Sequence, residues 1–190
     1  MHRELWHVVE IQGEIAKERK GRGQFYNWLV AMVFASYTVE AYLNFVGELV
    51  APQIWKDERN YFRKEPYRGF EGKLRRVMEL VSLPYARDAR PLKTVLELKE
   101  LRDLIAHPKT EPLDGCVRVP GQEPPILPAV TTLSKMVTAD ACAAAIQDVE
   151  GFLDSVHTAA QPNVDDVWFG ARALRGPAVY VGSTSRFTRD

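Results

Sequence analysis

Residues 24–50 read Gln-Phe-Tyr-Asn-Trp-Leu-Val-Ala-Met-Val-Phe-Ala-Ser-Tyr-Thr-Val-Glu-Ala-Tyr-Leu-Asn-Phe-Val-Gly-Glu-Leu-Val, and this stretch decides the fold. It is apolar on almost every side until Pro52 ends it, which is typical of a buried helix. Its charge-free part, 23–39, still holds several polar residues and is shorter than the roughly 20 apolar residues that span a bilayer. We therefore predict a central core helix and no membrane span.

Four further segments carry apolar residues at three- and four-residue steps, the spacing of an amphipathic helix. They are 4–20, 69–83, 92–106 and 139–160. Pro91 stands at the start of the fourth helix of the chain and Pro108 just beyond its end, while Thr138 is a suitable N-cap for the last one. The pattern predicts an all-α protein, a four- to five-helix up-and-down bundle.

Two regions fall outside this periodicity. Residues 109–137 contain five prolines and two glycines, with a short apolar alternation at 116–119, and predict a Pro-rich loop or hairpin insertion before the last helix. Residues 162–190 shift towards Gly, Ser, Thr and Arg and are too few to form a core of their own. We predict a bundle over 1–161 and a C-terminal extension over 162–190.

Composition limits the possible partners and location. Lys plus Arg and Asp plus Glu both total 25, so no overall basic field attracts nucleic acid and any RNA contact must be local. Cys116 and Cys142 have no disulfide or zinc spacing, and the charged first 20 residues lack a secretory apolar region. These features predict a cytoplasmic protein.

The three histidines other than His107 do not form a metal-ligand pattern. His2, His7 and His157 are far apart in sequence, and no Cys/His or carboxylate cluster has the spacing of a zinc or di-iron site. We predict neither a metal nor a cofactor. A basic cluster at 17–22 is interpreted as a solvated helix end, with a secondary RNA contact as the alternative.

Arg102 and His107 give the strongest functional signal, in the run Leu-Arg-Asp-Leu-Ile-Ala-His-Pro at 101–108. Arginine offers a planar charged fork for phosphate, and histidine titrates near neutral pH. Side chains five apart on a straight helix diverge by about 140°, but Pro108 frees His107 from helical geometry. The alternative is that both only favour the negative end of the helix dipole, at about 0.3–1 kcal/mol each.

Asp103, four residues before His107, is a candidate to orient the imidazole, or else a solvated helix charge. Glu40 and Asn44 lie four apart on the most apolar helix, where polar groups need partners. A core hydrogen-bond network is their simplest role. The functional alternative is that Glu40 reaches Arg102 and positions it.

Residues 102–107, Arg-Asp-Leu-Ile-Ala-His, resemble the motif of the HEPN superfamily, in which a bundle helix ends with an Arg, a polar residue, a few apolar residues and a His. Residues 39–45, Val-Glu-Ala-Tyr-Leu-Asn-Phe, are similar to a Glu–Ala–Asn stretch seen in bundle proteins of this kind. The resemblance spans roughly 4–160.

The resemblance implies a homodimer that brings two Arg–His pairs into one cleft, often with metal-independent RNase activity. Arg102 would then stabilise phosphate charge, His107 would be general acid or base while a ribose 2′-OH attacks, and Asp103 would be the polar partner. RNA and an antitoxin or regulatory protein are the implied partners, in a stress or defence role.

The motif also departs from one branch of the family. HEPN toxins usually carry a tyrosine directly after the histidine, where this chain has Pro108. Many relatives are non-catalytic modules, and a shared fold does not settle activity. A non-catalytic dimeric binding or regulatory module is therefore the second hypothesis, and a plain helical interaction protein, in which Arg102 and His107 only cap a helix, is the third.

Overall fold

The computed structural model describes residues 1–111, 131–164, 169 and 172–174. Its elements are α1 (His2–Glu18), α2 (Arg22–Val50), α3 (Pro52–Trp55), α4 (Glu58–Tyr61), α5 (Gly69–Leu80), α6 (Leu92–Ala106), α7 (Thr132–Met136), α8 (Ala139–Ala160) and a 3-10 turn, η1 (Gln161–Asn163). All regular structure in these ranges is helical, and five of the helices have 12 residues or more. The all-α prediction is confirmed.

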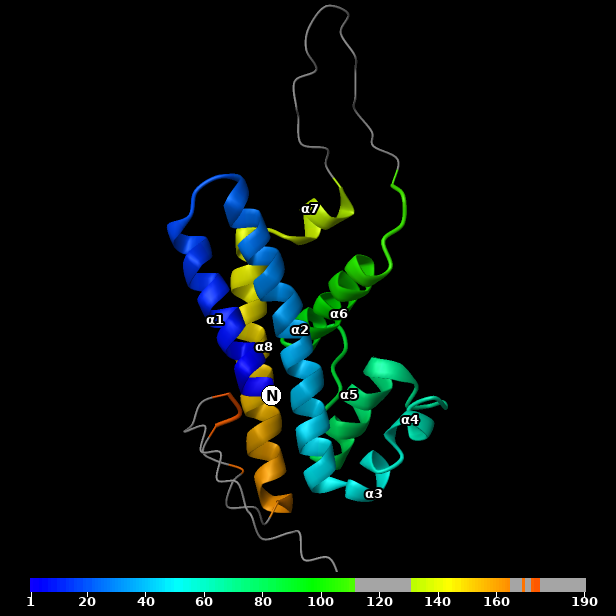
Figure 1. Cartoon of the computed structure of the whole chain (residues 1–190). Helices are drawn as coiled ribbons and strands as arrows, with labels where there is room; N and C mark the ends of the chain where they lie inside the picture. The colour runs from blue at the N-terminus through cyan, green and yellow to red at the C-terminus, as the bar shows by residue number, and fades with distance from the viewer. Residues whose placement is uncertain (112–130, 165–168, 170–171, 175–190) are drawn as a thin grey trace, which may run out of the picture.

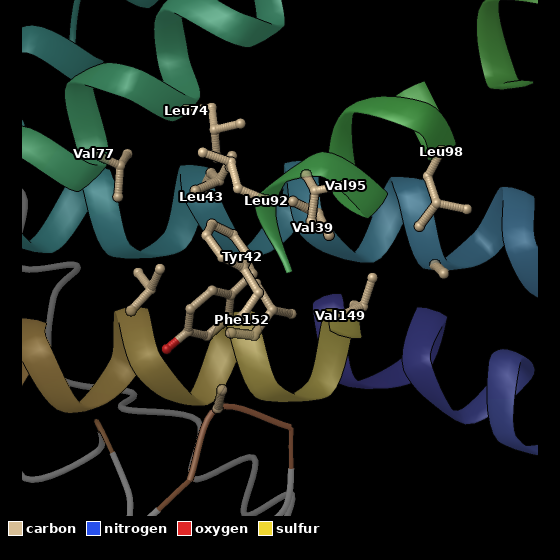
Figure 2. Packing of buried hydrophobic residues seen from close by; sticks show 14 of the residues in the cluster. Val39, Tyr42, Leu43, Leu74, Val77, Leu92, Val95, Leu98, Val149 and Phe152 are labelled. Carbon is tan, nitrogen blue, oxygen red and sulfur yellow. The ribbon is translucent and has the colours of Figure 1, made fainter. Parts of the chain in front are cut away.

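Helix α2 is the centre of the molecule, as its apolar sequence predicts. It packs against α1, α3, α5, α6 and α8, and in Figure 1 α1 and α8 run beside it while α5 and α6 lie on its other side. Val39, Tyr42, Leu43 and Val46 of α2 are completely or almost completely buried. Figure 2 shows this face meeting α5 and α6 on one side and Phe152 of α8 on the other. Burial of this apolar surface is the main force that assembles the helices.

The connectors contain more helix than the sequence pattern predicts. Residues 109–137 were expected to be irregular, yet α7 lies inside this range because Thr131 and Ser134 form a capping box. The Thr131 hydroxyl accepts from the Ser134 amide at 3.1 Å, and the Ser134 hydroxyl accepts from the Thr131 amide at 2.9 Å. Such a box satisfies two amides that a helix start leaves unpaired. The predicted hairpin arm at 116–119 lies outside the described residues.

Helix α5 ends earlier than predicted, at Leu80 instead of residue 83. Ser82 takes a positive φ of 58°, and the Leu83 amide donates to the Met78 carbonyl at 2.8 Å. This is the geometry in which a left-handed residue closes a helix and satisfies its last carbonyls. Apolar periodicity cannot mark such an end, because Val81 and Leu83 continue the pattern.

Part of the C-terminal extension belongs to the core. Phe169, Ala173 and Leu174 are buried, with 4%, 1% and 7% of their surface exposed, although the sequence divides the bundle from the extension at 161. The described part of the extension therefore packs on the helices and contributes apolar surface to them.

Helix α2 is long and apolar enough to span a membrane by length and composition, a property that core helices share. Half of its most apolar 18-residue window is buried inside the molecule. A cytoplasmic location without membrane contact remains a prediction.

Candidate functional site

Arg102 lies in the last turns of α6 and is held across the bundle by α2. Its Nη1 donates to the Glu40 carboxylate, a contact between residues 62 positions apart in sequence. The guanidinium carbon also lies 6.0 Å from the centre of the Tyr37 ring and 5.8 Å from that of Phe70. Only 18% of the Arg102 side chain is exposed. The contact with Glu40 that the sequence offered as an alternative is therefore present.

Asp103 forms ion pairs with two neighbouring cations, Lys99 and Arg102. Its carboxylate accepts from Lys99 at 2.6 Å and from Arg102 at 3.2 and 3.4 Å. The hydrogen bond from Lys99, and then the positive charges nearby, lower the pKa of Asp103 below its usual range. Asp103 therefore stays ionised and helps to fix the direction of the guanidinium.

His107 ends α6 in a non-helical conformation, with φ −131° and ψ 60°. Its link to Asp103 is through the main chain, because the His107 amide donates to the Asp103 carbonyl at 2.9 Å. The His107 side chain is exposed and forms no hydrogen bond or ion pair with the described residues. The expected orientation of the imidazole by the Asp103 carboxylate is thus not present in this single chain.

Asn44, one turn after Glu40 on α2, belongs to a separate polar group. Its side-chain oxygen accepts from Lys73 at 2.8 Å and from the Trp55 indole at 3.4 Å, and Lys73 also pairs with Glu58. Glycine is required nearby, since a Cβ on Gly47 would lie 2.0 Å from the Trp55 ring. Asn44 therefore anchors α3 and α5 onto α2, while Glu40 alone of the two reaches Arg102.

No family model, curated protein or solved structure matches this chain. Membership of the HEPN superfamily therefore remains a prediction from the sequence motif. Among the described residues, no group of three His, Cys, Asp or Glu side chains is placed to hold a metal ion.

None of the predicted site residues belongs to a second polar cluster, which His2, Tyr42 and His157 form. The Tyr42 hydroxyl and His157 Nδ1 share a buried hydrogen bond of 2.6 Å, and the His2 ring lies 5.1 Å from that of Tyr42. The Phe169 ring stacks on the His157 ring, with 4.1 Å between the ring centres and 5° between the ring planes. Burial raises the pKa of Tyr42 and lowers that of His2 to about 4.

One signal could have located this cluster. His157 falls four residues after Leu153 and eight after Val149, which places it on the apolar stripe of α8. A histidine at such a position is buried and needs a partner. The identity of that partner, 115 residues away, is not encoded in any local pattern.

Proposed function

We propose that this chain is a HEPN-like, metal-independent endoribonuclease that acts as a homodimer, with Arg102 and His107 as its catalytic residues. The supporting observation is the hydrogen-bonded ion pair between Glu40 and Arg102. It fixes a phosphate-binding group near the end of α6, five residues before the exposed His107. A preorganised cation stabilises developing negative charge best when it need not move during the reaction.

The contacts of Arg102 differ in strength in a way that suits this role. Glu40 holds Nη1 closely, whereas the contacts to Asp103 at 3.2 and 3.4 Å are long for charged hydrogen bonds. An incoming phosphate would therefore replace Asp103 on Nε and Nη2 while Glu40 keeps the guanidinium in place. A bidentate fork on phosphate is the geometry that arginine provides.

Cleavage would follow the usual course for RNA with a neighbouring hydroxyl. The 2′-oxygen bonds to phosphorus as a base takes its proton, and the bond to the 5′-oxygen breaks as an acid protonates that leaving group. The products are a 2′,3′-cyclic phosphate end and a 5′-hydroxyl end. One histidine cannot occupy both positions at once, so a second copy that contributes its own His107 completes the pair.

The surface around Arg102 suits contact with a second copy. Tyr37 on α2 and Ile105 on α6 are large hydrophobic side chains that are exposed, at 42% and 39%. The Tyr37 ring borders the guanidinium, so a copy that covers this apolar surface also approaches the arginine. Aromatic residues and arginine are enriched at protein interfaces relative to the rest of the protein surface.

A non-catalytic dimeric module is the second candidate, and one observation favours it. Glu40 and Asp103 balance the charges of Arg102 and Lys99 within this cluster, so the free site presents no excess of positive charge. A protein that binds a regulatory or antitoxin-like partner through Tyr37 and Ile105 needs no such excess.

The test is cleavage of a labelled mixed-sequence RNA in EDTA by the wild type and by Arg102→Ala and His107→Ala. His7→Ala is the matched control, since that side chain is 71% exposed on α1. We expect at least a hundredfold loss in both site variants, unchanged activity in the control, and dimers by sedimentation. Absence of wild-type cleavage, or equal activity in all variants, contradicts the proposal and favours the binding module.

A further inference from the structure

A pocket of about 420 Å³ opens directly beside the Arg102 cluster. Its walls are the turn that precedes α5, the first residues of α5 and the outer face of α6, two helices that lie next to each other in Figure 1. The volume falls within the range of about 300–1,000 Å³ that is typical of small-molecule sites.

Two residues belong to both the pocket and the Arg102 cluster. Phe70 lines the pocket, and its ring lies 5.8 Å from the Arg102 guanidinium. Lys99 also lines the pocket, and its ammonium lies 2.6 Å from the Asp103 carboxylate. A molecule in the pocket would therefore lie next to a phosphate bound at Arg102.

Part of the charge in the pocket wall is already paired. Glu71 accepts from the Tyr85 hydroxyl at 2.8 Å and from Arg87 at 3.0 Å, and these hydrogen bonds, that from Tyr85 first, lower the pKa of Glu71. Lys99 is paired with Asp103. These groups shape the wall and are not available to a ligand without breaking a contact.

The unpaired groups determine what the pocket can bind. In the described part of the chain, the side chains of Glu65, Arg68 and Glu100 take part in no hydrogen bond or ion pair, and all three line the pocket. Glu65 and Arg68 lie in the turn before α5, and Glu100 lies on α6. The pocket thus offers two free carboxylates, one free guanidinium and the partly buried ring of Phe70.

We propose that this pocket binds a guanine base of the RNA, next to the phosphate that is cleaved; this inference rests on the proposed function. Guanine alone among the four RNA bases presents two adjacent N–H donors, N1–H and the N2 amino group, on its Watson–Crick edge. A carboxylate accepts both, and we assign this contact to Glu100. The flat face of the base packs on Phe70, as unstacked RNA bases do on aromatic side chains.

Arg68 accounts for the remaining part of the nucleotide. Arg68 lines the same pocket, and the charge of its guanidinium suits a phosphate on the far side of the base. Glycine is required for this turn, because a Cβ on Gly72 would lie 1.9 Å from the main chain of Tyr67. The close approach of the turn to α5 holds Glu65 and Arg68 at the pocket mouth.

The experiment measures binding of GMP, IMP and AMP to the full chain by isothermal titration. IMP lacks the N2 amino group, and AMP lacks both donors. We expect GMP to bind at least tenfold more tightly than either. Glu100→Gln should abolish this preference, while Glu97→Gln, an exposed residue on the same helix outside the pocket, should keep it. Thermal melting verifies that both variants are folded.

The outcomes separate this inference from the proposed function. GMP and IMP binding equally, or Glu97→Gln and Glu100→Gln behaving alike, overturns the guanine site. RNA cleavage without preference for guanosine at the cut also overturns it, while the RNase proposal survives. Selective GMP binding without any RNA cleavage overturns the RNase proposal and leaves the guanine site in place.

Discussion

Glu40 and Tyr42 are two residues apart on α2, yet they belong to regions of opposite character. Tyr42 points towards α8, as Figure 2 shows, where it is completely buried against His157, on which Phe169 stacks. Glu40 holds the partly exposed Arg102, close to the exposed Tyr37. The first region is sealed from solvent, with Phe169 stacked on His157, and the second remains open to solvent. His157, which is packed on every side, serves stability, whereas His107, at an open helix end, is available for chemistry.

The largest expected difference between the two regions concerns their tyrosines. Tyr42→Ala should lower the free energy of unfolding by about 3–5 kcal/mol, since it removes a fully buried ring and leaves a cavity. Tyr37→Ala, on the same helix but 42% exposed, should lower it by less than about 1 kcal/mol. Urea denaturation measures both. Equal losses would contradict the distinction.

Acid should weaken the sealed region. Burial, and then the positive charges of the N-terminal amine and Arg3, lower the pKa of His2 from 6.5 to about 4, while Glu4 and the Ala173 carbonyl act in the opposite direction. The folded state therefore resists protonation that the unfolded chain accepts. The contribution of neutral His2 to the free energy of unfolding is fully present above pH 6.5, and it is lost as the pH falls towards 4.

The measurement is urea unfolding at pH 7.5 and pH 4.5. Between these two pH values, the free energy of unfolding of His2→Phe should fall by about 1–2 kcal/mol less than that of the wild type. This value allows for the partial exposure of His2 to solvent. His7→Phe, at an exposed position of the same helix, should follow the wild type. A His2 variant as acid-sensitive as the wild type would exclude this role for His2.

In the open region, the tie between Glu40 and Arg102 should be measurable but modest. A double-mutant cycle with Glu40→Gln and Arg102→Met should give a coupling of about 1 kcal/mol, because both side chains keep some contact with water. The coupling should fall in high salt. A coupling near zero would mean that Glu40 does not position Arg102.

The smallest effect is expected at the end of α6. His107→Ala should change the free energy of unfolding by less than about 0.5 kcal/mol, as the side chain is exposed and makes no polar contact within the described residues. Differential scanning calorimetry detects the change. A loss of more than about 1 kcal/mol would contradict this and would show that the His107 side chain has a structural role larger than a helix-dipole contribution.

Local sequence patterns predicted the long helices well. The bounds of α6 and α8 follow from Pro91, Pro108 and Thr138, since proline and a capping hydroxyl act within one turn of the chain. The sequence predicted the contact between Glu40 and Arg102 only as one of two alternatives, the other being a core hydrogen-bond network. The negative charge of Glu40 and its position on α2 limit the residues that could pair with it. Only the packing of α6 on α2 decides that the partner is Arg102.

Other features depend on contacts between distant residues. His2 and His157 meet Tyr42 through tertiary packing, which no spacing along the chain encodes. Asp148 on α8 likewise pairs with Arg90 at 2.6 and 2.9 Å and accepts from Thr94, fixing the start of α6. The one-turn helices α3, α4 and α7 are too short to show a period.

The bridge from Glu40 to Arg102 also affects when the site forms during synthesis. Both residues have been synthesised once α6 is complete, but α2 and α6 each also pack on α8, which is translated later. A nascent chain therefore carries both residues of the bridge before it has the last helix that packs on their two helices. The direct packing of α6 on α2 can form first, and α8 is added to both helices at the end of synthesis.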